Sequence, residues 1–264
     1  MLWLNLAAMA AYTGAMSNIP RLYLDHDLLA GAAIALADGQ GKYLTRVMRL
    51  ADGATVRVFN GRSGEWRGAL RVDGKRVSIE PIEQTRAQYE ALDLTLMFAP
   101  LKKTRTDFVV EKACELGVKQ IWPVITEYTQ TGRVRADKLR AVVFEAAEQT
   151  ERMDVPDVAE GQPLANALSQ WSPDKPLYYC DEAGEAKALR EVLESESRRA
   201  AGFLIGPEGG FSPREREMLR SLDFVIPVTL GPRILRAETA VVSALTLWQS
   251  EVGDWRNPPY LPES

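Results

Sequence analysis

The sequence contains little histidine and little cysteine for its 264 residues. His26 is the single histidine, which largely removes Ser-His-Asp hydrolysis, a conventional histidine base and histidine-rich metal sites. Cys114 and Cys180 are the two cysteines; they lie far apart and form no Cys-x-x-Cys pattern. The sequence therefore indicates neither a disulfide framework nor a zinc site, and we expect no metal ion.

Long apolar runs are absent beyond the first residues. Residues 1 to 15 are apolar, but they lack the basic segment of a signal peptide and are too short to cross a bilayer. We interpret residues 1 to 17 as a disordered extension or an addition from an upstream start codon, with export as the alternative. The rest of the chain predicts no transmembrane segment, so we expect a cytoplasmic protein with no membrane partner.

An excess of positive charge is absent as well. The net charge of −4 argues against a general nucleic-acid coat. Residues 1 to 88 nevertheless contain 11 Lys or Arg against 8 Asp or Glu, whereas the remainder has a net charge of −7. A solvated surface explains so small an asymmetry equally well, so charge alone leaves contact with nucleic acid open.

What the sequence does contain is a change of pattern after a polar segment, residues 83 to 90, which we interpret as a linker. Before it, residues 55 to 60, 65 to 72 and 76 to 82 predict short strands separated by the turns Asn-Gly-Arg-Ser-Gly and Asp-Gly. A helical insert over residues 42 to 50 places Arg46 and Arg49 three positions apart, on one side of a helix. These arginines fit either phosphate binding or a solvated helix face.

Beyond the linker the pattern alternates between strands and helices. Strands are predicted at residues 92 to 98, 121 to 126 and 177 to 180, and helices near residues 107 to 116, 138 to 149 and 185 to 197. Such alternation favours an α/β fold built on a mainly parallel sheet. The length allows two domains, which we place at residues 18 to 84 and 90 to 252, followed by a tail over residues 253 to 264.

The second domain is organised around residues 203 to 239. Two apolar runs, too short for helices, each end in a Gly-Pro turn, which predicts two buried strands that deliver two glycine-bearing loops. Ser212, Pro213 and Glu215 predict a capped helix between them. Because ligands bind at the carboxyl ends of parallel strands, these loops are the predicted binding site.

The first of these loops lacks the chemistry of a phosphate site. It has no lysine of the Gly-x-x-x-x-Gly-Lys-Ser/Thr type and does not match Gly-x-Gly-x-x-Gly. Glu208 would also repel phosphate. A flat ligand held by backbone groups and apolar walls fits better, because glycine lets the backbone approach closely.

The two loops carry a resemblance to a known family. Leu-Ile-Gly-Pro-Glu-Gly-Gly-Phe-Ser, followed downstream by Leu-Gly-Pro-Arg-Ile-Leu-Arg-Ala-Glu-Thr-Ala, resembles the paired signature of the RsmE family of SPOUT methyltransferases. The resemblance implies S-adenosylmethionine-dependent methylation of a uridine N3 in the 16S rRNA of the small ribosomal subunit, at uridine 1498 in the standard rRNA numbering. It also implies a SPOUT-type C-terminal domain with a trefoil knot, a small N-terminal PUA-like β-barrel, and a homodimer.

Given this resemblance, the chemistry of methyl transfer suggests which residues form the site. S-adenosylmethionine would be bound by residues of both loops: Ile205, Gly206, Pro207, Glu208, Gly209, Gly210, Leu230, Gly231, Ile234 and Leu235. Arg236 and Glu238 are the predicted catalytic residues, and Arg236 would stabilise the developing uracil anion. Glu238 would accept a proton, orient Arg236, or only favour the N-terminus of the helix that follows.

Basic residues of both domains match basic positions of the family. They predict an RNA-binding surface, although each also fits an ordinary surface charge: Arg21, Arg46, Arg49, Lys102, Arg105 and Arg152. Two positions depart from the family pattern, because Lys42-Tyr43 replaces a common histidine and Tyr128 replaces a common arginine. No role of those family residues is carried over to this chain.

The helix after Glu238 has an apolar face that predicts burial. Its members, which we expect to serve both the core and the dimer interface, are Ala240, Val241, Ala244, Leu245 and Trp248. Rival hypotheses are an RNA-binding module with an inactive second domain, a SPOUT enzyme acting on another rRNA or tRNA site, and a nucleotide-dependent α/β enzyme. The last would need phosphate ligands that the glycine loop does not offer.

Overall fold

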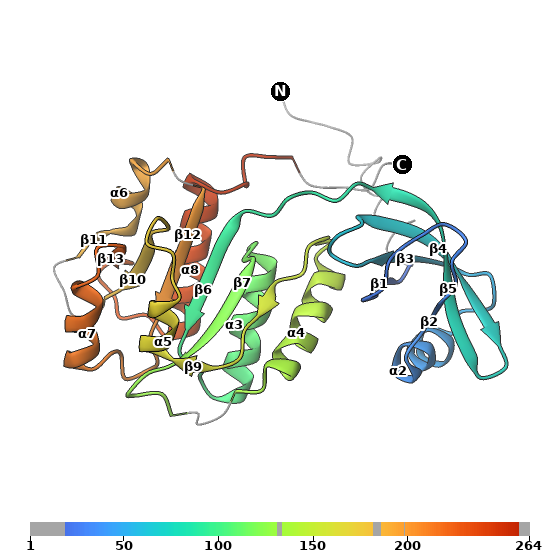
Figure 1. Cartoon of the computed structure of the whole chain (residues 1–264), viewed down its shortest axis with the longest axis horizontal. Helices are drawn as coiled ribbons and strands as arrows, with labels where there is room; N and C mark the ends of the chain where they lie inside the picture. The colour runs from blue at the N-terminus through green and yellow to red at the C-terminus, as the bar shows by residue number, and fades with distance from the viewer. Residues whose placement is uncertain (1–18, 131–133, 182–185, 198, 259–264) are drawn as a thin grey trace. The chain divides into compact units, whose positions relative to one another are not determined.

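The computed structural model describes residues 19–130, 134–181, 186–197 and 199–258, and Figure 1 shows their path. The chain forms two compact units, the first extending to Tyr89 and the second beginning at Glu90. The predicted extension, residues 1 to 17, lies outside the described residues, as does the predicted tail from residue 259 onward.

The first unit is a small mixed sheet. Its strands are β1 (Arg21–Tyr23), β2 (Ile34–Ala35), β3 (Thr55–Phe59), β4 (Glu65–Asp73) and β5 (Arg76–Arg86), in the order β1-β3-β4-β5-β2. β1 pairs parallel with β3, and the other pairs are antiparallel. Among the described residues β1 and β2 do not pair with each other, so the sheet is a half-barrel. The predicted linker over residues 83 to 90 was wrong in its first half, because β5 runs to Arg86.

A helical segment covers this sheet, but not as the spacing of its residues predicted. α2 (Asp38–Lys42) continues into η1 (Tyr43–Val47), a π-helical turn closed by a bond from Met48 N–H to Tyr43 O at 2.9 Å. Leu44 is fully buried among the apolar residues of the sheet and anchors the segment. The helix ends before Arg49, whose φ of 56° is left-handed, so Arg46 and Arg49 do not share the predicted helix face.

The second unit is an α/β domain, as the alternating pattern predicted. Its sheet contains β6 (Asp93–Phe98), β7 (Gln120–Ile125), β8 (Asp157–Val158), β9 (Gln162–Pro163), β10 (Leu177–Cys180), β11 (Lys187–Ala188), β12 (Ala200–Ile205) and β13 (Val225–Thr229). The order is β11-β13-β10-β12-β6-β7-β8, with β9 also on β7, and every pairing is parallel. The short β8, β9 and β11 were not predicted, since two residues carry no periodic signal.

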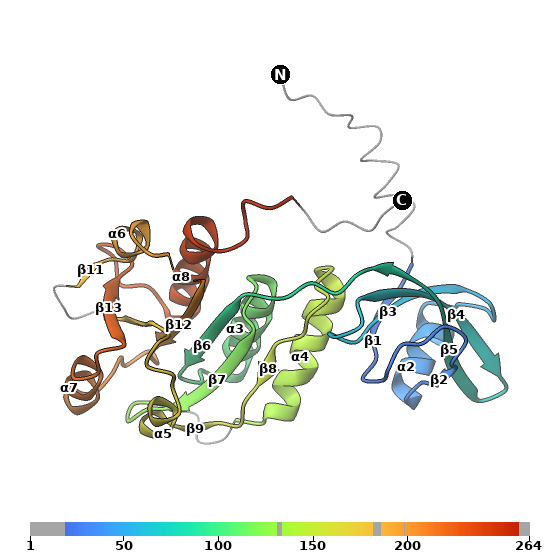
Figure 2. The same cartoon turned by 45° about the horizontal axis from the view of Figure 1, so that its top comes forward.

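Helices cover both faces of this sheet, as Figure 1 shows. They are α3 (Lys103–Glu115), α4 (Ala136–Gln149), α5 (Leu164–Ser169), α6 (Leu189–Glu194), α7 (Pro213–Arg220) and α8 (Ala237–Glu251). α5 and α7 contribute to the core cluster on one face, and α3 packs against both α4 and α8. Figure 2 shows α3 and α4 running side by side. The helix predicted at residues 185 to 197 is the shorter α6, and α5 was not predicted.

Alternation along the central strands places aromatic rings on each face. Tyr178 lies against Phe203 with ring centroids 5.3 Å apart, whereas Tyr179 meets Phe211 edge-on at 5.1 Å. β10 lies between β12 and β13, so the carboxyl ends of three neighbouring parallel strands meet at one edge of the sheet. In the part of the chain that the structure describes, no helix is long and apolar enough to cross a membrane. The trefoil knot stays a prediction.

Candidate functional site

A cavity of about 300 Å³ opens where β10, β12 and β13 end. It is lined by Cys180, Asp181, Ile205, Gly206, Val228, Thr229, Leu230, Gly231, Pro232, Arg233, Ile234, Leu235, Ala237 and Ala240. Six of the predicted ligand-binding residues are in this set: Ile205, Gly206, Leu230, Gly231, Ile234 and Leu235. The other four, Pro207, Glu208, Gly209 and Gly210, follow in the first loop but do not line the cavity.

The loop after β12 is fixed by close packing and by the cap of α7. A Cβ on Gly206 would lie 2.7 Å from the ring of the buried Phe211, so no larger residue fits there without displacing that ring. Ser212 and Glu215 form the predicted capping box, each side chain bonding the backbone N–H of the other. Glu215 also accepts a bond from Glu127 N–H at 2.9 Å.

The loop after β13 brings backbone and apolar groups to the cavity. Gly231 has a φ of 113°, which a residue with a side chain rarely adopts, and its N–H donates to Thr229 Oγ1 at 3.3 Å. Ile234 is 86% exposed, so its apolar side chain is uncovered beside the cavity. The loop therefore offers both polar backbone and an uncovered apolar surface to a ligand or partner.

Sequence reasoning missed the contribution of β10. Cys180 and Asp181 line the cavity from the end of this strand, and the Asp181 carboxylate is buried. Arg220 Nη2 donates to Asp181 Oδ2 at 2.6 Å, and this hydrogen bond raises the pKa of Arg220. Burial, with the Asp181 charge as a smaller cause, raises the pKa of Tyr179. The sequence does carry one signal for this contribution, because the charged Asp181 directly follows the short apolar run of β10.

The two predicted catalytic residues lie beside the cavity without lining it. Arg236 is exposed and is the N-cap residue of α8, while Glu238 lies in the first turn of that helix. Glu238 Oε1 is 3.6 Å from Arg105 Nε. Glu238 Oε2 is buried and accepts no hydrogen bond from the described residues. The apolar face of α8 is buried as predicted, comprising Ala240, Val241, Ala244, Leu245 and Trp248.

Two of the predicted RNA-binding residues are buried instead. Arg21 Nε bonds the fully buried Glu65 at 2.6 Å, and its guanidinium lies 3.7 Å from the centre of the Phe59 ring. Arg152 donates to the carbonyl oxygens of Cys114 and Val118 at 2.5 and 2.6 Å. Both guanidinium groups stabilise their own unit, so the structure gives no support for phosphate contacts by either.

The remaining predicted RNA-binding residues are accessible. Arg46, Arg49 and Lys102 are exposed. Arg105 is partly exposed, but its Nη1 donates to Glu208 Oε1 at 3.2 Å, so it connects α3 to the first loop. Within the described residues no group of three or more His, Cys, Asp or Glu side chains is placed to hold a metal ion.

Comparison with known proteins assigns this chain to a family. Residues 88–249 match the model of an RNA methyltransferase domain, and residues 36–82 match an RNA methyltransferase PUA domain. A Rickettsia conorii protein named ribosomal RNA small subunit methyltransferase E is 32% identical over 85% of this chain and 93% of its own length. The chain belongs to the RsmE family of RNA methyltransferases. The resemblance read from the two loops is thereby confirmed.

Solved structures support the same RsmE assignment. Ribosomal RNA small subunit methyltransferase E from Neisseria gonorrhoeae, bound to S-adenosyl methionine, superposes with a TM-score of 0.79 at 29% identity, covering 90% of this chain and 99% of that one. A methyltransferase from Legionella pneumophila in complex with the same cofactor has a TM-score of 0.76 at 27% identity, covering 88% and 97%. The predicted α/β fold with an N-terminal PUA-like unit is confirmed.

Proposed function

We propose that this chain transfers a methyl group from S-adenosylmethionine to N3 of one uridine in the 16S rRNA of the small ribosomal subunit, uridine 1498 in the standard rRNA numbering. The observation that carries the proposal is the cavity at the carboxyl ends of β10, β12 and β13, lined by both glycine-bearing loops. Membership of the RsmE family and the cofactor-bound relatives support it.

The residues of the cavity fit the proposed cofactor. A volume of about 300 Å³ is at the lower end of small-molecule sites. Ile205, Val228, Leu230 and Leu235 supply apolar walls for a flat adenine ring, and the glycine loops leave backbone groups accessible for its polar edge. Bound S-adenosylmethionine supplies an electrophilic methyl group. The buried carboxylate of Asp181 supplies negative charge at the cavity wall, although Arg220 already compensates part of it.

In this proposal Arg236 and Glu238 act on the base rather than on the cofactor. Methylation of N3 requires loss of its proton, which leaves negative charge on the uracil ring. The exposed guanidinium of Arg236, held at the start of α8 next to the cavity residue Ala237, would stabilise that charge. The buried Glu238 Oε2, which has no donor among the described residues, would accept the proton or hold the base edge.

We also propose that the protein acts as a homodimer in the cytoplasm. Ile234 is the residue with which we test self-association, because its apolar side chain is exposed at the edge of the cavity. Sedimentation equilibrium of the full chain, with Ile234→Asp as the matched variant, tests this part separately. A monomer at all concentrations would remove it and leave the methyl-transfer proposal in place.

The decisive experiment uses small ribosomal subunits from a strain that lacks the gene. Purified protein and labelled S-adenosylmethionine are incubated with these subunits, and the modified base is mapped by nuclease digestion and mass spectrometry. Methyl on N3 of a single small-subunit uridine is the expected result. Methyl on another rRNA site or on tRNA would keep the reaction and correct the substrate, whereas cofactor binding without transfer to any RNA would favour an inactive RNA-binding module.

A further inference from the structure

Most basic side chains of the first unit form ion pairs with acidic side chains of the same unit. Arg21, Arg57 and Arg86 surround the buried Glu65. On the surface, Arg67 pairs with Glu83, Arg71 with Glu80 and Lys42 with Asp38. These ion-paired side chains therefore add little to the positive electrostatic potential that an anionic partner would meet.

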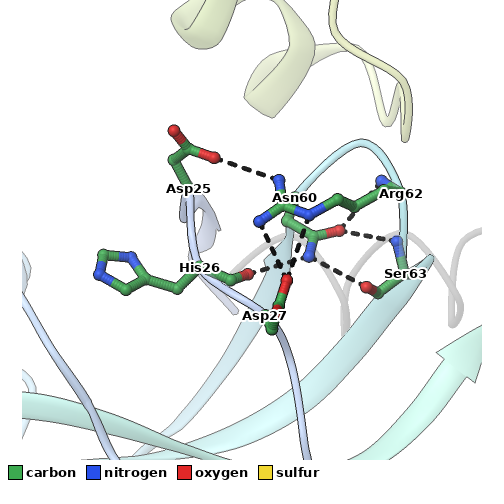
Figure 3. Close-up of polar contacts among 6 residues, drawn as sticks. All are labelled: Asp25, His26, Asp27, Asn60, Arg62 and Ser63. Atoms are coloured by element: carbon green, nitrogen blue, oxygen red, sulfur yellow. Dashed lines mark hydrogen bonds and ion pairs between the residues drawn. The ribbon is translucent and has the colours of Figure 1, made fainter.

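Arg62 is compensated in the same way, as Figure 3 shows. Its Nη1 donates to Asp25 Oδ1 at 3.1 Å, and its Nε and Nη2 donate to Asp27 Oδ1 at 3.3 and 3.2 Å. These carboxylates raise the pKa of Arg62. Asn60 fixes the loop by accepting the N–H groups of Arg62 and Ser63 at its Oδ1.

The uncompensated charge is therefore confined to two short segments. Arg46 and Arg49 lie in and just after η1, and Lys75 and Arg76 lie at the turn between β4 and β5. All four are exposed, and none forms an ion pair with another described residue. The two segments pack against each other through Gly41 of α2 and Val77, the residue after Arg76. They lie so close that a Cβ on Gly41 would be 3.1 Å from the Val77 side chain.

Exposed apolar side chains lie within the same helical segment. Tyr43 is 44% exposed, Val47 68% and Met48 37%, although Leu44 between them is fully buried. The π-helical turn brings Met48 one turn beyond Tyr43, through the bond from Met48 N–H to Tyr43 O. An aromatic ring, two apolar side chains and two arginines thus lie exposed within residues 43 to 49, around the buried Leu44.

We propose that α2, η1 and Arg49 form a base-stacking surface for single-stranded RNA, in which an unpaired base stacks on Tyr43 while Arg46 and Arg49 contact the adjoining phosphates. Aromatic rings interleaved with cations are the arrangement that binds unpaired nucleic acid. Asp38 is the carboxylate of this segment, and Lys42 compensates it. This inference rests on the proposed function for its choice of RNA, and the family match over residues 36–82 supports that choice.

The test is binding of the full chain to a labelled single-stranded RNA of about ten nucleotides, measured by fluorescence anisotropy over a range of salt. Tyr43→Ala should weaken binding about tenfold, whereas Tyr43→Phe should bind as the parent does, because stacking needs only the ring. Arg46→Gln should lower the slope of log affinity against log salt by about 0.7. Exposed residues of the same unit supply the controls, Leu29→Ala and Arg67→Gln, which should change neither quantity.

Several outcomes would overturn the inference. One is unchanged affinity in Tyr43→Ala and Arg46→Gln, and another is equal affinity of the parent for a perfectly paired duplex. If the variants lose affinity for ribosomal subunits but not for RNA, the surface contacts a protein and the inference is wrong. Because binding is measured without S-adenosylmethionine, failure of methyl transfer would not affect the result, and the two proposals can fail separately.

Discussion

Arg105, in the first turn of α3, donates from Nη1 to Glu208 Oε1 in the loop after β12 at 3.2 Å. The Nε of the same guanidinium lies 3.6 Å from Glu238 Oε1, at the start of α8. One side chain from a third element therefore connects the segments that follow both glycine-bearing strands. Local sequence could not show this link, because Arg105 and Glu208 are 103 residues apart.

Removing this link should affect the cofactor more than the fold. Arg105 and Glu208 are about one-third exposed, and exposed ion pairs contribute only about 0.2–1 kcal/mol. Arg105→Gln should therefore lower the melting temperature by no more than about 3 °C, while loosening of the loops should weaken S-adenosylmethionine binding about threefold to fivefold. Calorimetric titration and thermal denaturation measure the two effects.

A double-mutant cycle separates this contact from a general loss of charge. The effects of Arg105→Gln and Glu208→Gln on cofactor affinity should not add, since each removes the same contact. Lys112→Gln on the same helix, whose lysine pairs with Glu111 and Glu115, is the matched control and should leave affinity unchanged. Fully additive effects of the first pair would mean that Arg105 and Glu208 act independently.

Arg236→Ala should separate catalysis from cofactor binding. The side chain is exposed and does not line the cavity, so affinity for S-adenosylmethionine should stay within about threefold of the parent. The rate constant of methyl transfer in a single turnover should fall about 100-fold, because a preorganised charge at the reacting base is lost. Single-turnover methyl transfer to small subunits, together with calorimetric titration, gives both values.

The neighbouring Arg233 provides the comparison for Arg236. It lies in the same loop and lines the cavity, yet no role in the reaction is proposed for it. Arg233→Ala should therefore reduce turnover far less than Arg236→Ala. Equal losses in both variants would show that the loop needs positive charge in general and that Arg236 has no specific function.

The two cysteines should differ in reactivity, and the cofactor should protect the one that lines the cavity. Cys180 is half-buried at the cavity wall, whereas Cys114 is buried with its Sγ donating to Val143 O, and burial raises the pKa of Cys114 to about 11. N-ethylmaleimide at neutral pH should modify Cys180 and spare Cys114, because the thiolate is the reacting form. S-adenosylmethionine should slow modification of Cys180, as followed by mass spectrometry of the intact chain.

Denaturant supplies the control for this footprint. In about 6 M guanidinium chloride both cysteines should react, with or without the cofactor, since burial no longer distinguishes them. Modification of Cys180 at the same rate in the presence of saturating S-adenosylmethionine would place the cofactor away from the end of β10. ATP should give no protection, because the glycine loop lacks phosphate ligands.

The parts of the site that sequence predicted are those set by local spacing. Ser212 and Glu215 lie three residues apart, and the capping box they form needs no distant partner. Gly206 and Gly231 follow apolar runs that are too short for helices, so their places at strand ends were readable. The burial of Arg21 and Arg152 could not be predicted from the sequence, because burial of a guanidinium depends on partners such as Glu65 in other strands.

The π-helical turn could not be predicted from the sequence either, although it spans only a few residues. A spacing of three predicts one helix face only where the helix is regular, and η1 ends before Arg49 reaches it. Leu44, fully buried against the sheet, fixes this turn, and most members of its apolar cluster belong to the strands of the sheet. Asp181 was missed for a related reason, since its value to the site comes from strand order rather than from any motif.

The tightest constraint in the site lies between Gly206 and Phe211. A Cβ at residue 206 would lie 2.7 Å from a ring that is itself packed edge-on against Tyr179 and cannot swing away freely. Gly206→Ala should therefore distort the loop, lower S-adenosylmethionine affinity at least about tenfold and destabilise the fold by about 1–3 kcal/mol. Gly161→Ala, whose Cβ would meet Val134 at an ordinary 3.4 Å, should be nearly neutral. Adding Phe211→Leu to Gly206→Ala should restore part of the affinity because the smaller side chain makes room for the methyl group. Failure of that second substitution to help, with Gly206→Ala still folded, would show that the contact with Phe211 is not what requires glycine at residue 206.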